Sequence, residues 1–426
     1  MKNMQNNNIF TKLVIMFNKL LYSDYVFGLH QKLKSVFIRN DIKFIPNAFS
    51  QALKKESVID ENTILLISQE LTKTGAPLLL LNIAKTLKYK FNKKIVLITL
   101  IGGGLQTKFE EVCTVVNLHQ SNLLEINNKK LVNELFSRLA AKKVCFALGN
   151  TVCSAFFIPF LEKYQFSYKI LVHELPNTIS RFGWDKTAIR LLLNMENGVV
   201  IYSSSYVLSE HNIAYKKHPL KFSVIPQGMF QDVKDTINSE AKQKLIKKYN
   251  LPDNVKIIFN GGNDLLRKGA DIFYEIAQLV IKRRNDVAFI YLCNKDSMKY
   301  KLMFGNESFD ASKIIFDEFS DDYLLYLEGS DVFALTSRED PFPNVLLDSL
   351  AHGLPLIAFD NCGGAPDLLR KISETLIAKK LDVNDFVDKI LFLLDNKVFY
   401  QDVSLRSIQA VKDHYQFDQY VKQLIL

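Results

Sequence analysis

Cysteine is scarce in this 426-residue sequence, and long apolar runs are absent from it. The five cysteines are scattered, odd in number and without CxxC spacing, which argues against a disulfide framework and against zinc binding. Several fall inside apolar segments, a pattern typical of reduced thiols buried in a cytosolic protein. No apolar run approaches the roughly 18 residues of a membrane span. With the lack of repeats and low-complexity tracts, these features favour a globular protein of the cytoplasm.

Length and composition indicate two domains and an additional segment. A chain of 426 residues is too long for one typical hydrophobic core. Its 48% hydrophobic and 23% charged residues are ordinary for a globular protein. Lysine and arginine number 54 against 45 aspartates and glutamates, a surplus of +9. This surplus suits an anionic partner such as nucleic acid, a membrane surface or a phosphorylated ligand, but a well-solvated lysine-rich surface explains it equally well.

Residues 1–58 stand apart, and we expect them to be an amphipathic N-terminal extension. Ile9–Lys34 mixes large apolar residues with regularly placed lysines. Lys12, Asn18 and Lys19 interrupt any apolar core of a signal peptide, so none is expected. A helix of this kind either lies on a membrane surface, here the inner face of the plasma membrane, or covers part of the protein core.

Short β-branched runs that alternate with helical segments predict two successive parallel sheets, each covered on both faces. The runs of the first unit are Thr63–Ser68, Lys94–Leu100, Lys143–Leu148, Tyr168–His173, Gly198–Ser203 and Lys221–Pro226. Those of the second unit are Val255–Asn260, Val287–Leu292, Lys313–Phe316, Val332–Leu335 and Pro355–Phe359. A polar connection is expected near 228–238, and a final pair of helical segments from about 382 to 424. The predicted fold class is therefore α/β.

This pattern gives expected domain boundaries. We expect an N-terminal domain over 59–232 and a C-terminal domain over 233–400. The last segment, 401–426, is expected to form a helix that packs back on the N-terminal domain.

The segment 337–350 organises the second unit. Pro341 and Pro343 keep it from being helical after the strand Val332–Leu335, so a helix can start only near Asn344, a good N-cap residue. Asp340 then lies on a loop at the carboxyl end of a strand, and Asp348 one turn into the helix. Ligands of open α/β sheets bind at this edge, and helix starts attract phosphate. A charged, hydroxyl-rich molecule such as a nucleotide sugar fits these features.

Two further loops of the second unit reach the same sheet edge. Gly261 and Gly262 allow a ligand to approach the backbone, while Arg267 and Lys268 can neutralise a diphosphate. The Gly363–Gly364 pair, followed by Pro366 at a helix start, can present backbone N–H groups to an anion. Each of the loops at this edge therefore contains glycines or charged residues that could contact a ligand.

The loops of the first unit give weaker signals. Gly75 precedes a helix expected to start at Ala76 or Pro77, which is also an ordinary strand-to-helix turn. Gly103 lies in a glycine run that is not a GxGxxG fingerprint, which argues against an NAD-dependent oxidoreductase. His173 and Glu174 end a predicted strand, where the histidine either donates a hydrogen bond to a sugar hydroxyl or has a structural role.

In this order, the segments resemble retaining GT-B glycosyltransferases of family four, the glycosyl transferases group 1. The resemblance covers roughly 63–400 and is strongest in 331–369. The family has a paired-acid E-x7-E motif, and here Asp340 and Asp348 stand at the matching spacing, with Glu339 immediately before the first. The resemblance implies two Rossmann-like, doubly wound domains that face each other across a cleft.

The resemblance also implies roles for individual residues. The first acid, Asp340 or its neighbour Glu339, would contact the donor sugar, and Asp348 would bind the ribose hydroxyls. Lys268 matches the family lysine at the diphosphate, whereas the family arginine falls on Asn263 and Arg267 would compensate. The expected catalytic residues are Lys268, Arg267, Asp340 and His173. The expected donor-binding residues are Gly261, Gly262, Asn263, Glu339, Asn344, Val345, Asp348, Gly363 and Gly364. The expected acceptor-binding residues are Gly75, Ala76, Gly103 and Glu174.

The implied reaction needs no metal and no cofactor, because a helix terminus and basic side chains can stabilise the leaving nucleotide diphosphate. The implied partners are a nucleotide-sugar donor, a saccharide or lipid-linked acceptor and an anionic membrane, but no nucleic acid. The setting would be bacterial surface polysaccharide synthesis, such as lipopolysaccharide or capsule. The sequence departs from the family pattern at three places. Asn263 replaces the family arginine, Gln69 replaces a histidine that is common in one branch of the family, and two aspartates replace the glutamates of the paired-acid motif. These departures leave a second hypothesis, a catalytically weak homologue that acts as a binding or assembly subunit.

Overall fold

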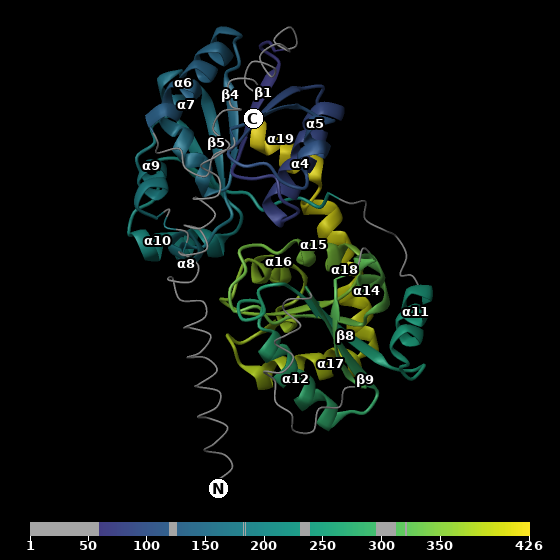
Figure 1. The fold of residues 1–426 in the computed structure, drawn as a ribbon. Coiled ribbons are helices and arrows are strands. Elements are labelled where there is room, and N and C mark those ends of the chain that lie inside the picture. Colours follow the sequence, from purple (N-terminus) through teal and green to yellow (C-terminus); the bar gives the residue numbers. More distant parts are fainter. Residues whose placement is uncertain are drawn as a thin grey trace. The chain divides into compact units, whose positions relative to one another are not determined.

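The computed structural model describes residues 59–118, 126–181, 183, 185–230, 239–294, 312–319 and 322–426 (Figure 1). The expected extension 1–58 lies outside the described residues, as does most of the connection expected near 228–238. The described chain forms two α/β sheets in succession. The predicted fold class is confirmed.

The first sheet has seven strands among the described residues, in the order β3-β2-β1-β4-β5-β6-β7. Parallel pairing joins β1 to both β2 and β4, so that Ile64 lies between Ile95 and Phe146. The strands are β1 Thr63–Ser68, β2 Lys94–Thr99, β3 Thr114–Asn117, β4 Phe146–Asn150, β5 Ser167–Val172, β6 Gly198–Tyr202 and β7 Phe222–Val224.

The second sheet has six described strands in the order β10-β9-β8-β11-β12-β13, and all its neighbours are parallel. The order reverses between β8 and β11, which places the ends of these two strands at the point where open α/β sheets bind ligands. The strands are β8 Lys256–Gly261, β9 Val287–Cys293, β10 Ile314–Glu318, β11 Val332–Leu335, β12 Leu356–Phe359 and β13 Ile377–Ala378.

Helices follow most of the strands. Those associated with the first sheet are α4 Gly75–Tyr89, α5 Gln106–Glu110, α6 Ile126–Ala141, α7 Ile158–Lys163, α8 Pro176–Arg181, α9 Arg190–Leu193 and α10 Ser205–Tyr215. The later ones are α11 Ser239–Tyr249, α12 Ala270–Arg283, α14 Tyr323–Gly329, α15 Asn344–Ala351, α16 Ala365–Ile372, α17 Val383–Asp395, α18 Lys397–His414 and α19 Phe417–Ile425. Three helices form at the end of the chain where the sequence predicted two, because Asn396 and Gln416 are each the N-cap residue of a new helix.

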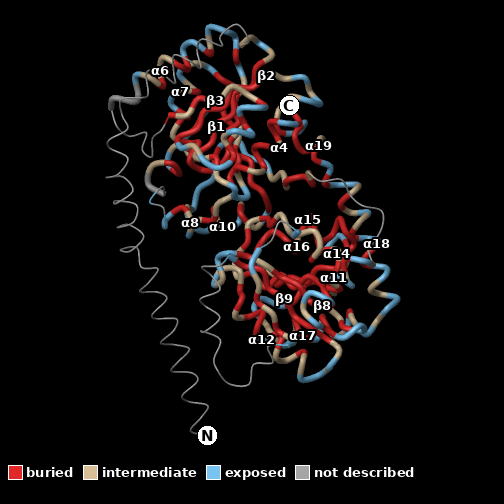
Figure 2. Tube along the Cα trace, turned by 45° about the vertical axis from the view of Figure 1, so that its right-hand side comes forward, coloured by how far each residue is buried: buried red, intermediate tan, exposed pale blue. Residues whose placement is uncertain are grey.

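The core of the second sheet consists of strands that are buried along their whole length. Every residue of β9, β11 and β12 is buried, and Figure 2 shows β9 in red. Helix α12 contributes the apolar stripe that includes Phe273, Ile276 and Val280, spaced three and four residues apart. Continuous β-branched and aromatic strands are expected where helices cover both faces of a parallel sheet.

The chain also divides into two compact units by its contacts. One unit contains the chain up to Tyr168 together with Asn177–Asn197, and the other contains Lys169–Pro176 together with Gly198–Leu426. Strands β6 and β7 are therefore grouped with the second unit although they extend the first sheet. The domain boundaries expected from the sequence stay a prediction.

Three strand predictions differ from the structure. The strand expected at Lys143 begins at Phe146, because Lys143 has a left-handed φ of 61° and turns the chain after α6. Strands β3 and β13 were not expected. Both are short, with four and two residues, and both lie at an edge of their sheet, where no long apolar run is required.

Gly269 connects β8 to α12 in a way that only glycine allows. Its φ is 66°, and a Cβ at this position would lie 2.0 Å from the carbonyl oxygen of Thr336. The Thr336 hydroxyl in turn donates to the Gly269 carbonyl at 2.8 Å. The helix that follows Lys268 is thus packed against the end of β11.

We expect Gly269→Ala to lower the free energy of unfolding well beyond the backbone effect alone. The matched control is Gly183→Ala, because Gly183 has a φ of 70° but no described atom within 4 Å of an added Cβ. Left-handed backbone should cost the control about 1–2 kcal/mol. The clash at Gly269 should add roughly 1–3 kcal/mol. Urea denaturation of both variants measures the difference, and equal losses would show that Thr336 yields freely.

Candidate functional site

The loops after β8 and β11 meet in a buried ion pair. Lys268 Nζ lies 2.6 Å from Asp340 Oδ2, with the two side chains only 17% and 8% exposed. The Ser337 hydroxyl donates to the same carboxylate oxygen at 3.2 Å. Two residues predicted to be catalytic, 72 positions apart in the sequence, are therefore in direct contact. Because both side chains are largely shielded from water, the ammonium and the carboxylate attract each other strongly.

Gly262 and Thr336 lie next to Lys268 and position it. A Cβ on Gly262 would lie 2.6 Å from Lys268 Cγ, so the missing side chain makes room for the lysine stem. The Thr336 hydroxyl also lies 3.2 Å from the Lys268 carbonyl and accepts from the Asn260 side chain at 3.0 Å. Gly262 was expected to admit a ligand, but in this structure the space beside it contains Lys268. Gly261 ends β8, where a Cβ would lie 3.1 Å from the Leu292 carbonyl oxygen.

Arg267 and Asn263 contact the protein where the sequence led us to expect diphosphate. Arg267 Nη1 donates to the Glu339 carbonyl at 2.8 Å, and its Nε donates to Asp264 at 3.3 Å. The side-chain amide oxygen of Asn263 accepts from the Asn294 backbone N–H at 2.9 Å, just past the end of β9. In this structure both side chains therefore fix the loops around the ion pair.

The loops after β11 and β12 are joined at Asp340. Its N–H donates to the Cys362 carbonyl at 2.9 Å, and the Gly364 N–H donates to the Asp340 carbonyl at 3.1 Å. A Cβ on Gly363 would lie 2.2 Å from that carbonyl oxygen, so glycine permits the close approach. The Gly364 N–H, which was expected to face an anion, is bonded to Asp340 here.

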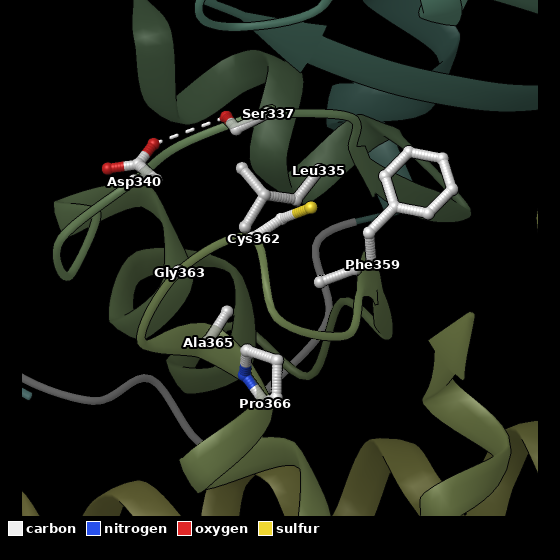
Figure 3. A pocket seen from close by; sticks show the side chains of 9 residues that line it. Leu335, Ser337, Asp340, Phe359, Cys362, Gly363, Ala365 and Pro366 are labelled. Carbon is white, nitrogen blue, oxygen red and sulfur yellow. Dashed lines mark hydrogen bonds between the residues drawn. The ribbon is translucent and has the colours of Figure 1, made fainter. Parts of the chain in front are cut away.

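A small cavity opens between these loops. Its volume is about 10 Å³, room for about one water molecule. Figure 3 shows the Ser337 hydroxyl directed at Asp340, with Cys362 and Phe359 on the other side. Burial raises the pKa of the Cys362 thiol to about 11, so this thiol is neutral at ordinary pH. The lining residues are Leu335, Ser337, Asp340, Ala358, Phe359, Cys362, Gly363, Ala365 and Pro366.

This geometry bears on whether Asp340 or Glu339 would contact the donor sugar. Asp340 lines the cavity and contacts Lys268, whereas Glu339 is half-buried and its carbonyl accepts from Arg267. Ser337 was not among the predicted site residues. It stands three positions before Asp340 in a loop, a spacing that brings a hydroxyl to a following carboxylate and could have suggested it.

Asp348 is buried on the first turns of α15. It is 8% exposed, and no described residue donates a hydrogen bond to its carboxyl oxygens. Burial raises the pKa of Asp348 to about 7. The Tyr323 hydroxyl of α14 is likewise buried without a described partner, and burial together with the charge of Asp348 raises the pKa of Tyr323 well above its usual range. An ionisable group in this state is common where a polar ligand is bound.

The start of α15 differs by one position from the expectation. Pro343 occupies the N-cap position and Asn344 is the first helical residue. The Asn344 side chain instead accepts a hydrogen bond from the Gln227 amide. Val345 is half-buried in the first turn. Without a side-chain cap, part of the first turn depends on water or a ligand for its N–H groups.

The predicted acceptor residues have local roles of their own. Gly75 is the exposed first residue of α4, and the Ala76 carbonyl accepts from the buried Asn150 amide at 3.0 Å. A Cβ on Gly103 would lie 2.4 Å from the Leu71 carbonyl, so this glycine allows two loops to cross. Glycine at 103 therefore has a structural explanation that needs no acceptor.

His173 follows β5 and is neutral near pH 7. Burial lowers the pKa of its imidazole to about 4. Its backbone N–H donates to the Glu174 carboxylate at 3.1 Å, while the Glu174 carbonyl lies 2.9 Å from His211 Nε2. A neutral imidazole can still donate one hydrogen bond, as the sequence-based hypothesis requires.

The described residues contain neither a metal-binding cluster nor a membrane-spanning helix. No three histidine, cysteine or acidic side chains there are grouped so that they could hold a metal ion. None of the described helices is both long enough and apolar enough to cross a bilayer.

Sequence comparison matches the second sheet to a known family model. Residues 254–396 match the family model described as "Glycosyl transferases group 1". The poly(ribitol-phosphate) α-N-acetylglucosaminyltransferase of Staphylococcus aureus is 23% identical over 185 residues, 42% of this chain and 37% of the relative. The N,N'-diacetylbacillosaminyl-diphospho-undecaprenol α-1,3-N-acetylgalactosaminyltransferase of Campylobacter jejuni is 24% identical over 183 residues, 43% and 46% of the two chains. The match thus spans less than half the length of each relative.

Structural comparison extends over both sheets. Anabaena HepE in complex with UDP and glucose has a TM-score of 0.67 at 16% identity, covering 85% of this chain and 97% of that one. WaaG, a glycosyltransferase involved in lipopolysaccharide biosynthesis, has a TM-score of 0.64 at 12% identity, with 85% and 99% covered. At these identities the likeness shows the fold. The chain has the GT-B fold, and residues 254–396 are similar to the glycosyl transferases group 1.

Proposed function

We propose that this protein is a glycosyltransferase that moves a sugar from a nucleotide-diphosphate sugar to a saccharide or lipid-linked acceptor. The buried Lys268–Asp340 pair carries the proposal, because it places a cation and a carboxylate together at the ligand-binding edge of the sheet that matches the family. Transfer leaves a nucleotide diphosphate with additional negative charge. Lys268 would stabilise that charge, and Asp340 would accept hydrogen bonds from the donor sugar.

Further residues would complete the donor site. The uncapped N-terminus of α15 would attract the diphosphate through its partial positive charge, and Asp348 in that helix would accept hydrogen bonds from ribose hydroxyls. We propose that Lys268, Arg267 and this helix terminus together offset the charge of the leaving diphosphate, so that the reaction needs no metal ion. Arg267 lies one residue from Lys268 and would add positive charge when its bond to the Glu339 carbonyl opens.

We also propose that the sugar is transferred with retention of configuration. Asp340 Oδ2 is bonded to both Lys268 and Ser337, an arrangement that suits binding of the sugar better than attack on it. Retention would then follow from attack by the acceptor on the face from which the diphosphate leaves. The acceptor would lie near Gly75, Gly103, His173 and Glu174.

The names of the relatives suggest the setting. One acts on poly(ribitol-phosphate) and another on a diphospho-undecaprenol, as their names state. We therefore propose a role in bacterial surface polysaccharide synthesis, with the protein acting at the inner face of the plasma membrane. One observation favours the second hypothesis, a catalytically weak homologue that acts as a binding or assembly subunit. Asn263 occupies the position of the family arginine, and its side-chain amide oxygen accepts a hydrogen bond from the Asn294 backbone N–H.

A panel of nucleotide sugars tests the proposal. We expect at least one UDP-, GDP-, ADP- or dTDP-sugar to raise the melting temperature, because a ligand at 100 times its Kd stabilises a protein by about 2.7 kcal/mol. Transfer is then followed by NMR at the anomeric proton of the product. Binding without hydrolysis or transfer would favour the binding subunit, and no binding by any donor would contradict the transferase.

A further inference from the structure

A basic and apolar surface is exposed between α10 and β7. It comprises residues 211–222, from the last turn of α10 through the following turn to the edge strand, and we name it the 211–222 surface. Ile213 is 68% exposed, Leu220 79% and Phe222 38%. Scattered apolar residues are normal on a protein surface, but three within ten positions need an explanation.

The charge of this surface is entirely positive. Lys216, Lys217 and Lys221 are all exposed, and so is His218. Residues 211–230 contain no aspartate or glutamate. Lys216 ends α10 with a left-handed φ of 51°, which turns the chain sharply into the loop that carries Leu220. Exposed lysines thus precede and follow the exposed Leu220 in the sequence.

A row of aromatic rings supports the turn. Tyr215, His211 and Tyr202 follow one another with ring centroids 5.4 and 5.3 Å apart, and Phe222 and His218 continue the row at 6.3 and 5.2 Å. All four contacts are edge-to-face, the geometry preferred by aromatic pairs. The exposed residues are therefore carried on a packed base that links α10, β6 and β7.

Protection of the sheet edge explains only part of this composition. Lysines on an edge strand prevent pairing with another strand, and β7 is an edge strand with only three residues. Exposed Ile213 and Leu220 would work against such protection, because apolar residues promote association. A second copy of the chain would also bring a like-charged surface to these lysines. A partner that offers both negative charge and apolar volume satisfies all the features.

We propose that the 211–222 surface binds anionic lipid bilayers, with Leu220 and Ile213 entering the headgroup region and the lysines contacting lipid phosphates. Apolar side chains at such a boundary gain from burial, and each lysine gains from the negative surface potential. Tyrosine and other aromatic residues also favour this boundary. The inference deepens the proposed use of a lipid-linked acceptor and depends on that proposal for its purpose. Vesicle binding involves no transfer, so each can fail without the other.

Sedimentation with vesicles tests the apolar part. The full chain is mixed with vesicles of phosphatidylcholine and phosphatidylglycerol, and the double variant Ile213→Ser/Leu220→Ser is compared with it. We expect the partition coefficient of the variant to fall at least about tenfold, because two large apolar side chains lose their burial. The matched control is Val398→Ser/Leu405→Ser, since these residues of α18 are 79% and 69% exposed but lie elsewhere.

A second double variant tests the charge. Lys216→Asn/Lys221→Gln keeps a residue at 216 that tolerates left-handed backbone. At about 1 kcal/mol for each lysine near an anionic surface, the partition coefficient should fall roughly thirtyfold. Its control is Lys143→Asn/Lys244→Gln, which removes two exposed lysines, one of them also at a positive φ, from other places. Added salt should weaken wild-type binding as well.

Three results would overturn the inference. The first is unchanged vesicle binding in both the apolar and the charge variant. The second is an equal loss in the matched controls, which would indicate a general effect of charge or hydrophobicity. The third is a wild-type dimer by analytical ultracentrifugation that becomes monomeric in Ile213→Ser/Leu220→Ser, since this would show that a second copy covers the surface.

Discussion

Replacing Lys268 by alanine is expected to lower turnover by more than tenfold and to destabilise the fold as well. Both effects have the same origin, because Lys268 is the only described cation within ion-pair distance of the buried Asp340 carboxylate. In the proposed reaction the lysine stabilises the departing diphosphate, a contribution of about 2.7–4 kcal/mol where one such group is removed. Removing one partner of a buried pair also costs about 3–5 kcal/mol of stability.

A double variant separates the two effects. In Lys268→Met/Asp340→Asn neither charge is left unpaired, so most of the lost stability should return while turnover stays low. Initial rates with a saturating donor measure turnover, and urea denaturation measures the free energy of unfolding. Turnover that recovers together with stability would mean that the lysine only holds the fold together.

The second sheet offers a matched control for Lys268. Lys242 Nζ lies 2.6 Å from Asp331 Oδ2, with the side chains 26% and 12% exposed, which closely resembles the Lys268–Asp340 pair. Asp331 immediately precedes β11, so the control pair lies at the amino end of the same strand whose carboxyl end leads to Asp340. Lys242→Ala should therefore lower stability with little effect on turnover. An equal loss of turnover in this variant would contradict the placement of the donor site.

The sequence predicted which loops meet at the carboxyl edge of the second sheet, because the positions of loops follow from the ends of strands. Lys268 and Asp340 were predicted from glycine- and proline-marked loops, and the strand order brings these loops together. Their direct pairing could not be predicted, because it depends on the conformations of two side chains 72 positions apart. For the same reason the bond from Arg267 to the Glu339 carbonyl was not expected. The type of a residue limits which groups its side chain can bind. The conformation of the packed loop determines which of these groups lies within reach.

The differences in the fold have a similar cause. Long apolar strands were predicted within one or two residues of their observed ends, since burial on both faces requires continuous apolar sequence. Strand β3 follows no such rule, because Thr114–Asn117 is mostly half-buried at a sheet edge. The predicted start of β4 was wrong because Lys143 adopts a left-handed conformation, which a lysine in the sequence gives no reason to expect. Local backbone choices and sheet edges thus remain the least predictable parts.

Replacing Asp348 by asparagine should stabilise the free protein and weaken donor binding at the same time. The carboxyl is buried, no described residue donates a hydrogen bond to it, and burial raises its pKa to about 7. Below pH 3.8 the group is protonated in both the folded and the unfolded chain. As the pH rises towards 7, the unfolded chain ionises while the folded chain does not, so the free energy of unfolding falls. The asparagine variant has no such penalty.

The expected gain therefore depends on pH with a definite sign. The stability difference between Asp348→Asn and the wild type should be small near pH 4, grow up to pH 7 and stay constant above it. With about 1.36 kcal/mol for each pH unit between the two pKa values, the difference reaches on the order of 4 kcal/mol. Chemical denaturation at pH 5 and pH 8 measures it. The control Asp331→Asn should be destabilised instead, because that carboxylate is bonded to Lys242, Lys256 and the Ile257 N–H.

Donor binding should change in the opposite direction. A carboxylate that accepts ribose hydroxyls loses about 1.5–3 kcal/mol when its charge is removed, so the Kd of the donor should rise roughly tenfold or more. Asp348→Ala should weaken binding at least as much, and Asp331→Asn should leave it unchanged. Isothermal titration at pH 8 gives these constants. A protein that becomes more stable and binds its ligand less tightly has lost a group kept for function, since a buried carboxyl without a protein partner does not stabilise the fold. Unchanged donor affinity in Asp348→Asn would instead make this carboxyl an isolated buried charge, and the ribose would have to lie elsewhere.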